Sequence, residues 1–266
     1  MTGKRFTLLG AQIQSLSLTD IVDRVEDSVQ CRQHRLILYH NLHSIYLYHH
    51  DKAMAALYEM ADYVYVDGMA LVFLARLFGI PLKCADRTTF VDCFETLIGH
   101  IAHRHWRVFY LGSKPGVAAR GAEILVNRFP GLQIATADGY FDAHSNSPEN
   151  KSVLDAINTF EPHILFVGMG MPRQERWLLE NLNKVAPMAI VTSGASMDYL
   201  CGEVAQPPRW AGPLGLYWFF RLVSEPTRLW RRYLLEPWYL LGFLVGQYFS
   251  KRTGFGQEHG SGSGQG

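Results

Sequence analysis

The stretch Ile164-Leu-Phe-Val-Gly-Met-Gly-Met-Pro-Arg-Gln-Glu175 contains the unit that decides the fold. Its first four residues are apolar and predict a short buried strand over 164–167. Residues 168–172 follow as a glycine-rich loop, and Arg173 begins a helix that the pattern extends to Asn183. A strand, a loop and a helix in this order form the unit from which parallel sheets are built.

The same alternation continues through most of the chain before residue 205. The other predicted strands are 6–13 (one strand or a hairpin turning at Gly10), 36–39, 63–66, 108–111, 132–135 and 189–192. The other predicted helices are 17–30, 44–60, 69–78, 90–103, 117–128 and 151–160. This pattern favours an α/β fold with a mostly parallel, Rossmann-like sheet that helices cover on both faces.

A parallel sheet of this kind binds ligands beyond the carboxyl ends of its strands. Several glycine or polar residues follow the predicted strands directly: Asn41, Asp67, Gly112, the loop 168–172, and the pair Ser193-Gly194. They are spread over about 150 residues of sequence, but the topology would gather them at one rim of the sheet. We therefore expect the functional site at this rim.

Composition excludes several classes of protein. The chain has 266 residues, of which 48% are hydrophobic and 18% charged, so a packed core is expected rather than disorder. The 25 basic residues are balanced by 24 acidic ones, which is not typical of a nucleic-acid-binding protein. None of the four cysteines forms a CxxC pair, which fits a reducing cytoplasm.

The last quarter of the chain differs from the rest. Residues 205–254 contain seven basic residues against two acidic ones, and four of the six tryptophans. The apolar run 233–250 contains Glu236 and Pro237 near its start, which argues against a transmembrane helix. A helix in the membrane interface and a helix docked on the core are both consistent with this composition. We therefore predict a core over 1–204, a helical, membrane-associating appendage over 205–254, and a disordered tail over 255–266.

Asp67 is the first candidate for chemistry. It follows the predicted strand 63–66 and precedes Gly68, so its carboxylate lies where a ligand would bind. An exposed carboxylate at the rim could act as a general base. Aspartate is also a favoured N-cap, so the residue could instead cap the following helix.

The glycine loops and an arginine set could bind phosphate. Gly168 and Gly170 would allow a ligand close to the backbone, and the helix that follows offers free N–H groups. The loop that begins at Gly112 could do the same, although neither loop is a complete dinucleotide or P-loop motif. If a helix continues past Pro226, three arginines share one of its faces: Arg221, Arg228 and Arg231. They could bind pyrophosphate or lipid headgroups, or they could form a solvated basic face.

No metal site is expected from the sequence. There is no DxD pair, no HExxH motif and no cysteine at zinc-ligand spacing. Gln174 offers an amide that could donate and accept hydrogen bonds in a site. Alternatively, it is a solvated residue on a helix surface.

Six motifs occur in a fixed order along the chain. They are Val66–Gly68, Arg87–Asp92 (RTTFVD), Phe109–Gly116 (FYLGSKPG), Asp138–Phe141 (DGYF), Ile164–Glu175, and Pro208–Arg228 (PRWAGPLGLYWFFRLVSEPTR). In combination, they resemble the WecG/TagA/CpsF family of bacterial glycosyltransferases. The resemblance covers roughly Phe6 to Trp238.

The resemblance implies inverting, metal-independent transfer of a sugar from a UDP-sugar to a polyprenyl-pyrophosphate-linked acceptor. It implies a peripheral protein at the cytoplasmic face of the membrane, with no cofactor beyond the donor, and allows a homo-oligomer. Asp67 matches the family's proposed base. The expected substrate-binding residues are Asn41, Arg87, Thr89, Asp92, Gly112, Gly168, Gly170, Gln174, Arg221, Arg228 and Arg231.

One residue departs from the family pattern. Relatives often carry threonine two residues before the asparagine that matches Asn41, whereas this chain has Tyr39. The resemblance therefore does not identify the transferred sugar. Two other functions stay open from the residues alone, a nucleotide-dependent oxidoreductase and a non-catalytic membrane adaptor.

Overall fold

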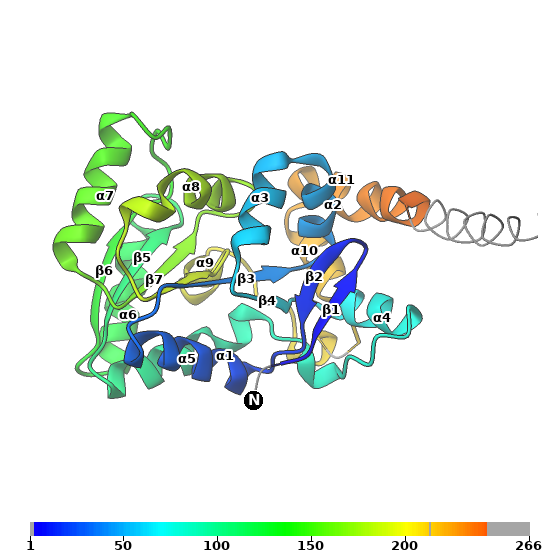
Figure 1. Ribbon diagram of the computed structural model, residues 1–266, viewed down its shortest axis with the longest axis horizontal. Coiled ribbons are helices and arrows are strands. Elements are labelled where there is room, and N and C mark those ends of the chain that lie inside the picture. Colours follow the sequence, from blue (N-terminus) through cyan, green and yellow to red (C-terminus); the bar gives the residue numbers. More distant parts are fainter. Residues whose placement is uncertain (1–2, 213, 244–266) are drawn as a thin grey trace, which may run out of the picture.

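Eight strands form one sheet in the order β1-β2-β4-β3-β8-β7-β5-β6 (Figure 1). The computed structural model describes residues 3–212 and 214–243. Only the edge hairpin β1–β2 pairs antiparallel, and every other pairing is parallel. The strands are β1 (Arg5–Leu8), β2 (Ala11–Gln14), β3 (Arg35–His40), β4 (Tyr63–Val66), β5 (Arg107–Gly112), β6 (Gln133–Ala137), β7 (Ile164–Gly168) and β8 (Ala189–Thr192).

Helices cover both faces of the sheet, as the strand–helix alternation predicts. One group of helices packs against one face: α1 (Leu18–Gln30), α5 (Phe90–His103), α6 (Val117–Arg128) and α9 (Ser196–Leu200). A second group of helices covers the opposite face: α3 (Lys52–Met60), α7 (Pro148–Phe160) and α8 (Arg173–Asn181). A third cluster joins the hairpin, α2 (Leu42–His50) and α4 (Met69–Leu77). Figure 1 shows α1 and α5 on one side of the strands and α7 and α8 on the other.

The single helix predicted over 44–60 is wrong, because the chain forms two helices that meet at Asp51. The Asp51 carboxylate accepts a hydrogen bond from the Ala53 backbone N–H at 2.9 Å, so it caps the N-terminus of α3. The same carboxylate accepts one from Arg176 Nη2 at 2.7 Å. A side chain that caps a new helix competes with continuation of the old one, which explains the break.

Two glycines predicted to lie near a ligand, Gly112 and Gly168, also allow strand ends to approach each other. A Cβ on Gly112 would lie 2.3 Å from the carbonyl oxygen of Gly168. A Cβ on Gly168 would lie 2.1 Å from the Tyr110 hydroxyl and 2.6 Å from the Gly194 carbonyl oxygen. These positions need glycine for packing at the carboxyl ends of β5 and β7, independently of any ligand.

The segment after residue 205 is helical and docks beside α2 and α4. It forms α10 (Tyr217–Ser224) and α11 (Pro226–Leu234), and residues 236–243 are helical as well. Leu240 is buried in the cluster of the hairpin and α4, and the Tyr239 ring lies 4.2 Å from that of His50. In the described part of the chain, no helix is long and apolar enough to cross a membrane.

Much of this docked segment still presents apolar side chains to solvent. Trp238 is 70% exposed, and Trp210, Trp218 and Trp230 are also exposed. The docked-helix alternative from the sequence is therefore confirmed for the described residues, and contact with a membrane stays a prediction. The tail predicted over 255–266 and residues 244–254 of the appendage lie outside the described residues.

Candidate active site

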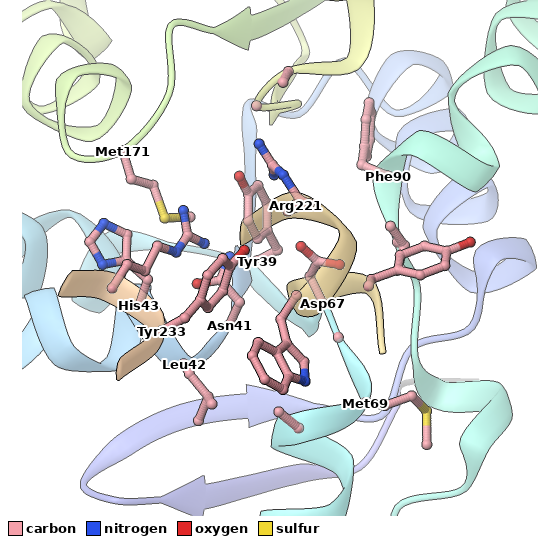
Figure 2. Close-up of a pocket in the computed structure, with 18 of the residues that line it drawn as sticks. Tyr39, Asn41, Leu42, His43, Asp67, Met69, Phe90, Met171, Arg221 and Tyr233 are labelled. Carbon is pink, nitrogen blue, oxygen red and sulfur yellow. The ribbon is translucent and has the colours of Figure 1, made fainter. Parts of the chain in front are cut away.

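A cavity of about 560 Å³ lies at the rim where the site was expected. The residues that follow β3, β4, β7 and β8 form its floor, and α10 and α11 close it from above. Its floor includes Asn41, Asp67, Gly170, Ser193 and Gly194. The topology thus brings together residues separated by about 150 positions in sequence. Figure 2 shows Asp67 and Arg221 with their side chains directed into this space.

Asp67 lies at the carboxyl end of β4, directly before the start of α4. The backbone N–H of Asp67 donates to the His40 carbonyl oxygen at 2.8 Å, which fixes the residue at the end of β4. Gly68, with φ of 99°, occupies the N-cap of α4, so Asp67 precedes the cap. Burial raises the pKa of Asp67, while a hydrogen bond from Thr89 and the charge of Arg87 act in the opposite direction.

The loop after α4 brings two predicted residues to Asp67. Arg87 bridges to Val66, and the Thr88 N–H donates to the Val66 carbonyl oxygen at 3.0 Å, so the loop runs along the end of β4. Arg87 Nη1 donates to Thr89 Oγ1 at 3.1 Å, and both side chains line the cavity. Asp92 lies in the first turn of α5, and its side chain is outside the described part of the structure.

Three arginines of the C-terminal helices line the cavity, but they are not the predicted three. They are Arg221, Arg228 and Arg232, whereas Arg231 is not among the lining residues and stacks its guanidinium over the Trp230 ring. The prediction required one continuous helix past Pro226. Instead α10 ends at Ser224 and α11 begins at Pro226, because proline is favoured in the first turn of a helix. Within α11, Arg228 and Arg232 are four residues apart and share a face.

Glu225 lies between the two helices and orients two of these arginines. Its Oε2 accepts from Arg221 Nη2 at 3.4 Å, and its Oε1 accepts from Arg228 Nε at 2.9 Å. Arg221 also stacks over the Tyr199 ring at 5.5 Å, and its buried Nε has no hydrogen-bond partner among the described residues. A buried donor in this position fits an anionic ligand.

Asn41 and His43 occupy the side of the cavity formed by α2. Asn41 caps α2, because its Oδ1 accepts from the Ser44 N–H at 3.0 Å, and its side chain also lines the cavity. His43 Nδ1 lies 2.7 Å from Glu236 Oε2, which ties α2 to the C-terminal segment. The sequence pattern did not identify His43 or Arg232; a helix starting at Pro226 would have placed Arg232 on the face of Arg228.

Gln174 lies behind the cavity wall rather than in it. It is fully buried, and its Oε1 accepts from the Gly170 N–H at 3.2 Å. Its Nε2 donates to Glu175 Oε1 at 2.7 Å, so the amide holds the glycine loop in place. The hydroxyl of Tyr39, a floor residue of the cavity, also hydrogen-bonds with Gln174, and burial raises the Tyr39 pKa above its usual value.

Sequence comparison decides the class of protein. Residues 6–254 match the WecG/TagA/CpsF family of glycosyl transferases. The chain belongs to this family. It is therefore a glycosyltransferase, which decides against the oxidoreductase and the membrane adaptor.

Similar proteins share this assignment. A protein of Bacillus spizizenii named N-acetylglucosaminyldiphosphoundecaprenol N-acetyl-beta-D-mannosaminyltransferase is 32% identical over 190 residues, which cover 71% of this chain and 70% of that protein. Proteins of the same name from Bacillus subtilis (30% over 185 residues, 69% of each chain) and Staphylococcus aureus MW2 (28% over 181 residues, 68% of each chain) are also similar.

The described residues contain no group of three or more histidine, cysteine, aspartate or glutamate side chains that could hold a metal ion. The positive charge that lines the cavity comes from arginines, namely Arg87, Arg221, Arg228 and Arg232.

The buried Glu175, which accepts a hydrogen bond from Gln174 behind the cavity, allows a test of whether burial keeps a carboxyl group protonated. Burial raises its pKa to about 7 from 4.5, so between these pH values the folded protein holds a proton that the unfolded chain has lost. The contribution of Glu175 to the free energy of unfolding should therefore fall as pH rises from 4.5 to about 7. We expect Glu175→Gln to be more stable than wild type by about 3 kcal/mol at pH 8 and nearly equal at pH 4.5, in denaturant unfolding.

The exposed Glu59 on α3 supplies the matched control, because Glu59→Gln should change stability equally little at both pH values. An equal stability difference for Glu175→Gln at pH 4.5 and pH 8 would show that the Glu175 carboxyl is not protonated by burial.

Proposed function

We propose that this glycosyltransferase transfers a sugar, with inversion, from a UDP-sugar to a polyprenyl-pyrophosphate-linked acceptor. The observation that carries the proposal is the cavity itself, which Asp67 lines together with Arg87, Arg221 and Arg232. The similar proteins are named for N-acetylmannosaminyl transfer to an N-acetylglucosaminyl diphosphate lipid, so UDP-N-acetylmannosamine is the first donor to test.

Asp67 acts as the base in this reaction. Its carboxylate takes the proton of the acceptor hydroxyl while that oxygen forms a bond to the anomeric carbon. The bond between the anomeric carbon and the β-phosphate oxygen breaks, and UDP leaves with the electron pair. A pKa raised by burial brings the carboxyl closer to working pH, which suits a general base.

Arginines balance the charge that develops on the leaving group and on the acceptor pyrophosphate. Arg221 and Arg232 reach the cavity from above, and Arg87 reaches it from the floor. Guanidinium groups bind phosphate through two donors at once, and they are already in position before the reaction. In this proposal the arginines stabilise the negative charge that a divalent cation could otherwise stabilise, and no metal is required.

The exposed aromatic residues after residue 205 support action at the cytoplasmic surface of the membrane. Tryptophan and arginine are favoured at the level of lipid headgroups. Trp218 lines the cavity and is 40% exposed, so the surface that would meet the membrane begins at the mouth of the site. Residues 1–204 would then form the core domain and residues 205–254 the appendage that completes the site.

Replacing Asp67 tests the base directly. We expect Asp67→Asn to lower kcat by about 100- to 10,000-fold, because the amide cannot accept the proton. The measurement is transfer from UDP-N-acetylmannosamine to an N-acetylglucosaminyl diphosphate lipid, with the melting temperature as the control for folding. Near-normal turnover in a folded Asp67→Asn protein would remove Asp67 from this role.

The arginine pair Arg221 and Arg231 provides a matched comparison. Arg221→Gln should lower kcat/KM by about 10- to 100-fold, since it removes charged hydrogen bonds to phosphate in a partly buried site. Arg231→Gln removes the same charge from an exposed position outside the lining, so we expect a change of about twofold or less. Equal losses in the two variants would mean that net positive charge, and not placement in the cavity, is what matters.

A further inference from the structure

A second, entirely apolar hollow of about 390 Å³ opens next to the active-site cavity. Helix α4 forms one wall with Phe73, Leu74 and Leu77, and the C-terminal helical residues Leu240 and Leu241 form the other. This apolar groove contains no polar or charged side chain among its described lining residues.

The groove and the active-site cavity adjoin each other. Leu42, Ala70 and Pro237 line both of them, so these three residues form the junction. The rest of the cavity lining includes Arg228 and Arg232, whereas every described lining residue of the groove is apolar. A cationic cavity and an apolar groove therefore lie side by side.

The outer part of the groove is open to solvent. Leu77 is 79% exposed and Phe73 is 48% exposed on α4, although both are large apolar residues. Leu241 is 48% exposed on the opposite wall. Exposed apolar surface arranged around a hollow marks a binding site for an apolar partner.

We propose that this apolar groove binds the first isoprene units of the acceptor lipid. The inference rests on the proposed function, and it places the acceptor by charge complementarity and by the lining residues that the groove and the cavity share. A pyrophosphate held by the arginines at the junction would direct the attached lipid chain away from the cations and along α4. The acceptor sugar would then point toward Asp67, on the opposite side of the arginines.

The test compares two acceptors that share the N-acetylglucosaminyl diphosphate group. One carries an ethyl group, and the other carries a farnesyl chain of three isoprene units. Both are assayed with UDP-N-acetylmannosamine in solution, below micelle concentrations and without membranes, so that surface adhesion does not contribute. For the wild-type chain, kcat/KM should be at least about tenfold higher with the farnesyl acceptor, because apolar area is buried.

A double variant alters the groove without touching the active-site cavity. Leu77→Glu with Leu241→Glu places charge on both walls, at positions that are already exposed. We expect it to lose about tenfold in kcat/KM with the farnesyl acceptor and about twofold or less with the ethyl acceptor. The matched control, Phe78→Glu with Val223→Glu, changes two exposed apolar residues outside the groove lining and should behave as wild type.

The possible results distinguish a failure of the groove assignment from a failure of the proposed function. Equal losses on both acceptors, or equal losses in the control variant, would overturn the groove assignment while leaving the transferase activity in place. A wild-type chain that transfers to the ethyl and farnesyl acceptors equally well would also overturn it. Transfer to neither acceptor, from UDP-N-acetylmannosamine or from any other UDP-sugar in a panel of donors, would overturn the proposed function, and the groove assignment with it.

A photoreactive farnesyl diphosphate gives a second, independent measurement, because it needs binding but no turnover. Crosslinks should map to residues 70–77 and 237–241. Crosslinks confined to α10, where Phe219 and Val223 are exposed, would place the lipid on the other apolar surface and contradict the groove assignment.

Discussion

The Asp67 carboxylate and the guanidinium groups that line the same cavity constrain the architecture of this glycosyltransferase. Burial disfavours the ionised form of Asp67, and the nearby positive charges of Arg87, Arg221 and Arg232 favour it. Two of these three arginines belong to the C-terminal helices, so the ionic environment of Asp67 is complete only when those helices are docked. The sheet supplies the carboxylate, and the appendage supplies most of the counter-charge.

This dependence explains why the C-terminal segment is tied to the core at several points. Glu236 contacts His43 on α2, Leu240 enters the core near α4, and Arg221 stacks on Tyr199. Glu225, at the break between α10 and α11, sets the direction of Arg221 and Arg228. In the proposed function, the same segment also meets the membrane, so membrane contact and completion of the site would favour the same docked arrangement.

The sequence predicted the sheet and the rim well, because both depend on local pattern and on a general rule of α/β topology. Apolar strands followed by glycine or polar residues are visible in the sequence, and parallel pairing gathers their ends. The break at Asp51 was missed because capping by that carboxylate competes with an otherwise continuous helical pattern. Arg231 was chosen over Arg232 because the helix was extended through Pro226 instead of restarted there. Whether glycines such as Gly168 serve a ligand or a neighbouring strand depends on distances between strand ends, which no pattern in one strand encodes.

We propose that the arginines of the cavity, with Asp67, carry out this transfer without a divalent cation. The rate of sugar transfer from UDP-N-acetylmannosamine to the farnesyl-linked acceptor, by the wild-type chain in excess EDTA, tests this proposal. The rate should stay within about twofold of that in magnesium or manganese, because fixed guanidinium groups balance the charge. Loss of transfer in EDTA, restored by adding either metal ion, would show that a divalent cation takes part in the reaction.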